Sequence, residues 1–237
     1  MFIPLHDANR LRHIRHQYVT LVIIGLNIVT YLLTSSAGIE FSQAAAYGFG
    51  YIPSVNYNLA ILPPELAMVP PSLTYITYAF VHNDLLHLGG NMLFLWVFGD
   101  NVEDALGHLR FLIFYLACTV AGAVAHGMVM PWSQMPLIGA SGAVAGVVSA
   151  YFLLHPKVKL WVLMFARIPL RLPAYLVLAT WIATQFLMIL FDTDGMISWA
   201  AHIGGIIAGA VLIIPLRRRG VPLFDRGVVA PEPAKLD

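Results

Sequence analysis

Charged residues are scarce in this sequence. Only 11% of its 237 residues are Asp, Glu, Lys or Arg, whereas 59% are hydrophobic. A soluble domain carries about 25% charged residues, so this composition excludes an ordinary soluble protein and indicates one embedded in a lipid bilayer. The net charge of +1 gives no reason to expect a nucleic-acid partner.

Disulfide and metal-binding motifs are also missing. The single cysteine, Cys118, excludes a disulfide framework and a cysteine-based metal site. No His-Glu-x-x-His motif is present, so a zinc protease of that type is unsupported. Asp100 has no second carboxylate in its apolar segment, which argues against a pair of catalytic aspartates. A metal held by His87, Asn91 and His202 would lack a carboxylate or thiolate to complete its ligands, and we expect neither metal nor cofactor.

Long apolar segments are abundant. A helix that crosses a bilayer needs about 20 mostly apolar residues. Six segments reach or approach that length: 18–35, 85–102, 111–130, 137–154, 172–191 and 197–216. The sequence therefore predicts an all-α membrane protein built as a bundle of six transmembrane helices.

The 13 lysines and arginines support this count. With six spans they all fall on one side: before the first span, between the second and third, between the fourth and fifth, and after the sixth. Positively charged connections stay in the cytoplasm, so both termini are predicted to be cytoplasmic. The predicted parts are an N-terminal segment 1–17, a membrane domain 18–216 and a tail 217–237.

Two of the connections expected outside the membrane differ in composition and in expected structure. The first, 37–72, is rich in proline and has no basic residue. It is too apolar for a flexible linker and too broken by proline for another span, so we expect it to lie in or against the membrane interface. The connection 192–195 is expected to be a tight polar turn.

One hydroxyl stands among small residues in the fourth span. Ser141 lies in the sequence Gly-Ala-Ser-Gly-Ala-Val-Ala-Gly over residues 139–146. Small residues let membrane helices approach closely, so a serine that serves only packing is the commoner interpretation. A serine nucleophile would need a base at the same depth in the membrane.

The sixth span supplies a candidate base, His202. The fourth and sixth spans each carry two glycines four residues apart, at Gly142 and Gly146 and at Gly205 and Gly209. Residues four apart share a helix face, so both spans are predicted to have a flat stripe on which the other can pack. Both spans run inward from the outside, so this packing would bring Ser141 and His202 to a similar depth, as a nucleophile and its base require.

A polar cluster opens the second span, with His82, His87 and Asn91. His87 and Asn91 share one helix face, and such side chains can donate hydrogen bonds to a developing oxyanion. The amide of Ser141, at the start of a helix, is a further candidate donor. The alternative is a structural network between helices, and His82 is expected to have that role.

In combination these motifs resemble the rhomboid intramembrane serine proteases of bacterial type. The matching pieces are Gly-Ala-Ser-Gly at 139–142, Ala-His-x-x-Gly-x-x-x-Gly at 201–209 and the histidines and asparagine of 82–91, with further similarity at 99–104 and 110–115. The resemblance runs from about residue 18 to residue 216. It implies a six-helix bundle with a water-filled cavity open to the outside.

The resemblance also implies a reaction. Ser141 would be the nucleophile, His202 the general base, and His87, Asn91 and the Ser141 amide the oxyanion donors. The reaction would be cofactor-free hydrolysis of a peptide bond in or near a transmembrane segment of a substrate protein, often a single-pass one. The implied location is the bacterial inner membrane, with residues 192–197 and the top of the fifth span as lid and lateral gate.

The sequence departs from the family pattern in two places, one that concerns the anchoring of the first external loop and one that concerns the orientation of His202. Some rhomboids carry a Trp-Arg pair in the first external loop, but 37–72 contains neither residue type. We expect aromatic residues to anchor this loop instead: Tyr47, Phe49, Tyr51 and Tyr57. Some members place an aromatic residue on the base four residues after the nucleophile, where this chain has Ala145, and no carboxylate is placed to orient His202.

Three classes of function can be compared. The first is an active serine endopeptidase that uses Ser141 and His202. The second is a catalytically inactive relative that binds transmembrane helices, which would not need both residues. The third is a small channel or transporter, for which repeats or paired broken helices are expected, and the sequence shows neither. The sequence thus favours the protease.

Overall fold

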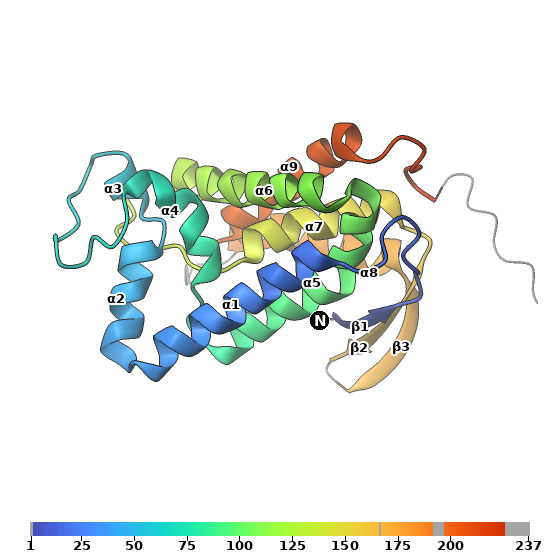
Figure 1. Cartoon of the computed structure of the whole chain (residues 1–237), viewed down its shortest axis with the longest axis horizontal. Coiled ribbons are helices and arrows are strands. Elements are labelled where there is room, and N and C mark those ends of the chain that lie inside the picture. The colour runs from blue at the N-terminus through green and yellow to red at the C-terminus, as the bar shows by residue number, and fades with distance from the viewer. Residues whose placement is uncertain (1, 166, 192–196, 226–237) are drawn as a thin grey trace, which may run out of the picture.

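The computed structural model describes residues 2–165, 167–191 and 197–225. Long helices run side by side, with short helices gathered at one end and a small sheet at the other (Figure 1). The long helices are α1 (Tyr18–Ser36), α5 (Leu85–Leu106), α6 (His108–Val129), α7 (Ser141–Leu154), α8 (Ala174–Phe191) and α9 (Trp199–Leu216). The short ones are α2 (Ile39–Phe49), α3 (Pro53–Asn56), α4 (Pro71–Thr77) and the 3-10 turn η1 (Tyr78–Phe80).

The structure confirms a mostly helical protein, but only some of the six predicted spans have the length and composition of a membrane-spanning helix. Among the described residues, four helices are long and apolar enough to cross a membrane: α1, α6, α8 and α9. Helix α5 is 22 residues long, but its second half carries Asp100, Glu103 and Asp104. Helix α7 is apolar but has only 14 residues, because Leu137 pairs with Tyr51 in a β-bridge and Gly139 takes φ +105° before the helix begins.

The prediction of an all-α protein is also wrong. Three antiparallel strands form a sheet in the order β1 (Phe2–Asp7), β2 (Lys159–Met164) and β3 (Ile168–Pro173). Strands β2 and β3 form a hairpin between α7 and α8, and the N-terminal strand pairs with β2. Leu160 and Val162 are fully buried while Lys159 and Trp161 beside them are exposed, so one face of the hairpin covers the end of the helical bundle.

Helix α7 lies at the centre of the molecule (Figure 1), and nearly all of its side chains are buried. The predicted packing of the two glycine stripes is confirmed. A Cβ atom on Gly205 would overlap the carbonyl oxygen of Gly142, and one on Gly209 would overlap that of Gly146. Ser149 strengthens the contact, since its Oγ lies 2.9 Å from the Ile206 carbonyl oxygen of α9. Helices α7 and α9 are therefore in backbone contact.

Acidic residues at the end of α5 fasten the N-terminal segment. Glu103 accepts hydrogen bonds from the amides of Val19 and Thr20, which caps the first turn of α1. Asp104 accepts hydrogen bonds from three successive amides, those of Arg12, His13 and Ile14. The similarity to rhomboids over residues 99–104 thus falls on a structural clamp.

Asp7 ties the sheet to two helices. Its Oδ2 accepts a hydrogen bond of 2.7 Å from the Tyr151 hydroxyl on α7 and one of 3.1 Å from the Asn101 amide on α5. The side chain of Asp7 is buried. Strand β1 is therefore held both by its ladder to β2 and by this carboxyl group.

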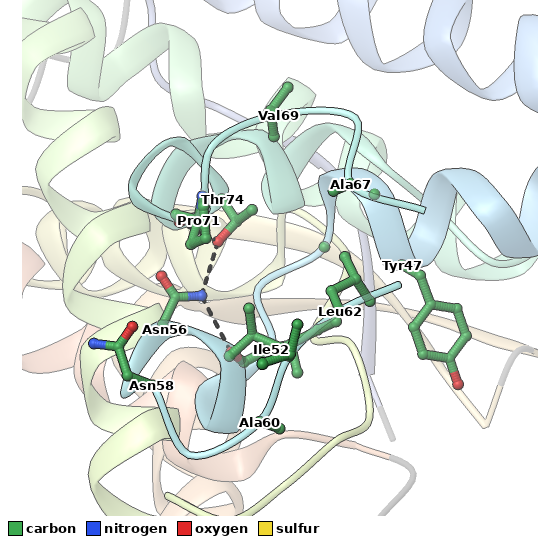
Figure 2. Close-up of a pocket in the computed structure, with 14 residues that line it drawn as sticks. Tyr47, Ile52, Asn56, Asn58, Ala60, Leu62, Ala67, Val69, Pro71 and Thr74 are labelled. Carbon is green, nitrogen blue, oxygen red and sulfur yellow. Dashed lines mark hydrogen bonds between the residues drawn. The ribbon is translucent and has the colours of Figure 1, made fainter. Parts of the chain in front are cut away.

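The connection between α1 and α5 is anchored by backbone pairing and polar side chains. Tyr51 and Leu137 exchange two backbone hydrogen bonds, and the buried Tyr51 ring lies 4.7 Å from that of Tyr75. Figure 2 shows Asn56 donating 3.1 Å hydrogen bonds to the Ile52 carbonyl and to Thr74 Oγ1, beside a recess of 260 Å³. These contacts hold the loop in place of a Trp-Arg pair.

Of the four aromatic anchors predicted, two reach α6. The hydroxyls of Tyr51 and Tyr57 both lie against Gly127, where a Cβ atom would collide with them. The Phe49 carbonyl accepts a 2.6 Å hydrogen bond from Thr77 Oγ1, so this position is held by its backbone. The loop is therefore fixed to α6 and to the segment before α5.

We predict that Gly205→Ala destabilises the protein. The added methyl group must push α7 and α9 apart, and overpacking of this kind costs about 1–3 kcal/mol. The melting temperature in detergent, followed by tryptophan fluorescence, measures the effect. Gly25→Ala on α1 is the matched control, because its Cβ would meet nothing within 4 Å. An equal loss in both variants would contradict the backbone contact.

We predict that two substitutions of Asp7 destabilise the protein to different extents. Asp7→Ala removes the acceptor of two buried hydrogen bonds and should cost about 1–3 kcal/mol of unfolding free energy. Asp7→Asn keeps an oxygen acceptor and should cost little. Burial raises the pKa of Asp7 above 3.8, against the opposing effect of the Tyr151 hydrogen bond.

The raised pKa of Asp7 determines whether the stability of the protein rises or falls with pH. A carboxyl group with a higher pKa in the folded state favours folding when protonated, so stability falls as the pH rises from the unfolded pKa through the folded one. Asp7→Asn should remove this decline in stability, as measured by melting curves recorded from about pH 3.5 to about pH 8. A decline that persists in the variant would show that another group causes it.

Candidate active site

Ser141 is the first residue of α7. The chain reaches it through Gly139, whose φ of +105° favours glycine because a side chain there is strained. The side chain of Ser141 is half-buried, and its hydroxyl makes no hydrogen bond to another described residue. By contrast, Thr119 and Ser149 bond to carbonyls three or four residues earlier in their helices. Among the described residues the Ser141 hydroxyl thus has no hydrogen-bond partner.

His202 lies in the first turn of α9 and is half-buried. Its Nδ1 lies 2.8 Å from Oε1 of Gln185 on α8. The amide nitrogen of Gln185 donates to the Trp181 carbonyl at 2.8 Å, so the oxygen is the atom that faces the imidazole. Since an amide oxygen only accepts, Nδ1 carries the proton and Nε2 is left as the basic nitrogen.

Two tryptophans complete the surroundings of the imidazole. The ring of Trp181 stacks on His202 at 6.4 Å between centroids and 27° between planes, and Trp199 meets it edge-on at 5.7 Å. Gln185 is only 4% exposed. The imidazole is therefore oriented from α8 and from its own helix, so an aromatic residue at the position of Ala145 is unnecessary.

The contact between α7 and α9 lies beside both candidate residues. A Cβ on Gly142, directly after Ser141, would lie 3.3 Å from the carbonyl oxygen of Ala201, directly before His202. Among the described residues no hydrogen bond joins Ser141 to His202. Catalytic hydrogen bonds are often long before substrate binds, so this arrangement is compatible with a nucleophile and base.

The polar cluster of α5 borders the same place. A Cβ on Gly139 would collide with the imidazole of His87, so that ring lies against the chain that leads into Ser141. His82 Nε2 accepts hydrogen bonds from the Asn91 amide at 3.1 Å and from the Ala140 amide at 3.4 Å. His82 therefore joins the loop before α7 to α5, the structural role expected for it.

The two predicted oxyanion donors differ in how accessible they are to a substrate. Asn91 is buried and already donates to His82, whereas His87 is half-buried and lies 5.0 Å from the His82 ring, centroid to centroid. Asn91 keeps a second amide hydrogen. His87 is thus the more accessible of the two donors.

Sequence reasoning missed Gln185. It is the one amide side chain in the apolar segment 172–191 and follows Trp181 by four residues, so both share a helix face. A lone polar residue in an apolar helix was the available signal. The expected polar turn at 192–195, and most of the expected lid, lie outside the described residues.

Comparisons with known proteins identify the family of this chain. The family model of the rhomboid domain matches residues 72–219. Rhomboid protein 1, mitochondrial, of Saccharomyces cerevisiae is 30% identical over 147 residues, 60% of this chain and 41% of that protein. Rhomboid protease GlpG of Yersinia pestis is 32% identical over 147 residues, 58% of this chain and 46% of that protein.

A third relative, rhomboid protease GluP of Bacillus subtilis, is 39% identical over 75 residues, 32% of this chain and 14% of that protein. The alignments cover less than half of each of these relatives. The relatives are mitochondrial and bacterial, so they do not distinguish the bacterial type expected from the sequence. Because the model of the rhomboid domain covers more than half of the chain, this protein belongs to the rhomboid family.

Proposed function

We propose that this protein is a serine endopeptidase that hydrolyses peptide bonds in or near transmembrane segments of other membrane proteins. The observation that carries the proposal is the orientation of His202. Gln185 Oε1 lies 2.8 Å from Nδ1 and accepts a hydrogen bond from it, which leaves Nε2 as a base beside the contact between α7 and α9. The uncommitted hydroxyl of Ser141 starts the facing helix.

The proposed reaction has two halves. Ser141 Oγ attacks the substrate carbonyl carbon while His202 Nε2 takes its proton. The developing oxyanion is stabilised by the Ser141 amide, which has no intrahelical partner at the helix start, and by His87 and Asn91. The imidazolium then protonates the leaving amine, and water hydrolyses the acyl-enzyme by the same proton route.

The neutral partner of His202 distinguishes this site from a Ser-His-Asp triad. Gln185 fixes the tautomer and direction of the imidazole but adds no negative charge to stabilise the imidazolium. Most of the rate acceleration must therefore come from positioning and from the oxyanion donors.

We further propose that α1, α5, α6, α7, α8 and α9 form a six-helix membrane domain over 18–216, with both termini cytoplasmic and a bacterial inner membrane as its location. The short α7 is consistent with this arrangement because other helices surround it. Helix α8 is consistent with a lateral gate, since only Ala174, Val177, Leu178 and Gln185 are buried along it. Substrates would be single-pass or other transmembrane proteins.

We predict that Ser141→Ala and His202→Ala each abolish cleavage. Loss of a nucleophile or its base typically removes several powers of ten of the rate, about 10³-fold or more. The purified protein is incubated in proteoliposomes with a single-pass substrate that carries small residues at the cleavage site, and products are identified by mass spectrometry. Unchanged melting temperatures serve as the control for folding.

The same variants separate the proposed function from its alternative. A fluorophosphonate probe should label the native protein at Ser141, and His202→Ala should abolish this labelling. A native protein that neither cleaves substrate nor reacts with the probe, but binds transmembrane helices, would be an inactive relative. Full cleavage by Ser141→Ala would overturn the mechanism.

We predict that Gln185 acts as a positioning residue. Gln185→Leu keeps the side-chain size but removes the acceptor, so His202 loses its fixed tautomer and the maximal labelling rate should fall about 10- to 1,000-fold. Gln185→Glu keeps an oxygen acceptor and should retain most of that rate.

A spectroscopic signature distinguishes this role from simple support of the fold. The ¹⁵N shifts of labelled His202 should show a protonated Nδ1 in the native protein and a mixture of tautomers in Gln185→Leu. If Gln185→Leu labels at the native maximal rate while Ser141→Ala does not react, Gln185 has no positioning role although the dyad stands.

A further inference from the structure

A positively charged recess lies away from the candidate active site, where α6 begins and α9 has ended. Its volume is 570 Å³, and its lining includes Arg110 from the first turn of α6 with Arg218 and Arg219 from the segment after α9. His108 also lines it, and no carboxylate of the described residues does. Three arginines therefore line this recess without a counter-ion among the described lining residues.

The position of Arg218 is fixed by the fold. Its backbone amide donates a 2.8 Å hydrogen bond to the Ala105 carbonyl at the end of α5. Its guanidinium lies over Gly107, where a Cβ atom would be 2.8 Å from Nη2. Gly107 has φ +84°, so glycine both permits the turn and leaves room for the guanidinium. The Nε of Arg218 is buried and has no hydrogen-bond partner.

The start of α6 adds to the positive potential. Its N-cap residue, Gly107, offers no side chain, and its first turn contains no acidic residue. The free amides of a helix start carry a partial positive charge and normally attract an acidic group. Here the first turn instead carries His108 and Arg110, so this helix start is a favourable place for an anion.

The carboxylate that contacts His108 is already occupied. Glu103 binds His108 and the amides of Val19 and Thr20, and it does not line the recess. Among the described residues Arg110 makes one long hydrogen bond of 3.4 Å, to the Leu216 carbonyl. The guanidinium groups around the recess thus keep donors available for a ligand.

The place of the recess in the fold indicates the ligand. Helices α6 and α9 both have the length and composition of membrane spans, so the recess at their ends lies at the depth of lipid headgroups. Leu109 beside it is 70% exposed, which offers an apolar surface to an acyl chain. We propose that this recess binds a phosphate group of net negative charge, as carried by the headgroup of an anionic phospholipid.

Thermal unfolding of the full chain in neutral detergent tests the proposal. Dihexanoyl phosphatidylglycerol should raise the melting temperature by about 2 to 4 °C more than dihexanoyl phosphatidylcholine does. Sodium phosphate at matched ionic strength forms the third arm. Stabilisation by phosphate alone to the same extent would assign the site to free phosphate, whereas stabilisation only by the lipid would assign it to the headgroup.

Two variants of equal charge make the test specific. Arg218→Gln removes a guanidinium from the recess, and Arg171→Gln removes an exposed one from β3. The anionic additive should stabilise Arg171→Gln like the native protein and Arg218→Gln much less. Equal stabilisation of both variants, or equal effects of the two lipids on the native protein, would overturn the proposal. If Arg218→Gln does not fold, Arg110→Gln replaces it in the same comparison.

Discussion

The close approach of α7 and α9 is the constraint on which the other arrangements depend. At two successive turns a carbonyl oxygen of α7 occupies the space where α9 would carry a Cβ, at Gly205 and at Gly209. In a bilayer, helices gain little from hiding apolar surface from one another, so such contacts hold them through packing at short range. The same contact sets the relative depth of Ser141 and His202, which stand beside it. A substitution that separates the helices would therefore disturb the candidate chemistry as well as the fold.

Helix α8 has a different relation to the rest of the bundle. Its outer face is largely exposed, and few of its residues are buried, so it is held less firmly than α7. It nevertheless carries Gln185, which fixes His202, and Trp181, which stacks on the imidazole. If α8 is the wall that a substrate helix displaces, its movement must alter the orientation of the base. Entry of a substrate and readiness for proton transfer would then be coupled through one hydrogen bond.

The sequence allowed some of these features to be predicted, and the physical reason differs for each. The glycine spacing predicted the contact of α7 and α9 because the pattern is local and a helix turns it into a surface. The length of α7 could not be read from its apolar run, because Leu137 pairs with Tyr51, a residue far away in the chain. The sheet was missed although Leu160 and Val162 alternate with exposed residues, since two short strands between helices depend on a third from the N-terminus. The role of Gln185 depends on the rotation of α8 against α9, which only tertiary packing fixes.

Some polar side chains of this protein have several hydrogen-bond partners, and others have donors or acceptors without a partner among the described residues. Glu103, Asp104 and Asp7 are filled with hydrogen bonds from amides, a hydroxyl and a carboxamide, and each fastens one segment to another. Such groups stabilise a fold because leaving any of them unpaired would be costly. Ser141 Oγ, Nε2 of His202 and the guanidinium of Arg218 lack such partners among the described residues. These three groups stand in places held by close glycine contacts, and they remain available for molecules that come from outside the chain.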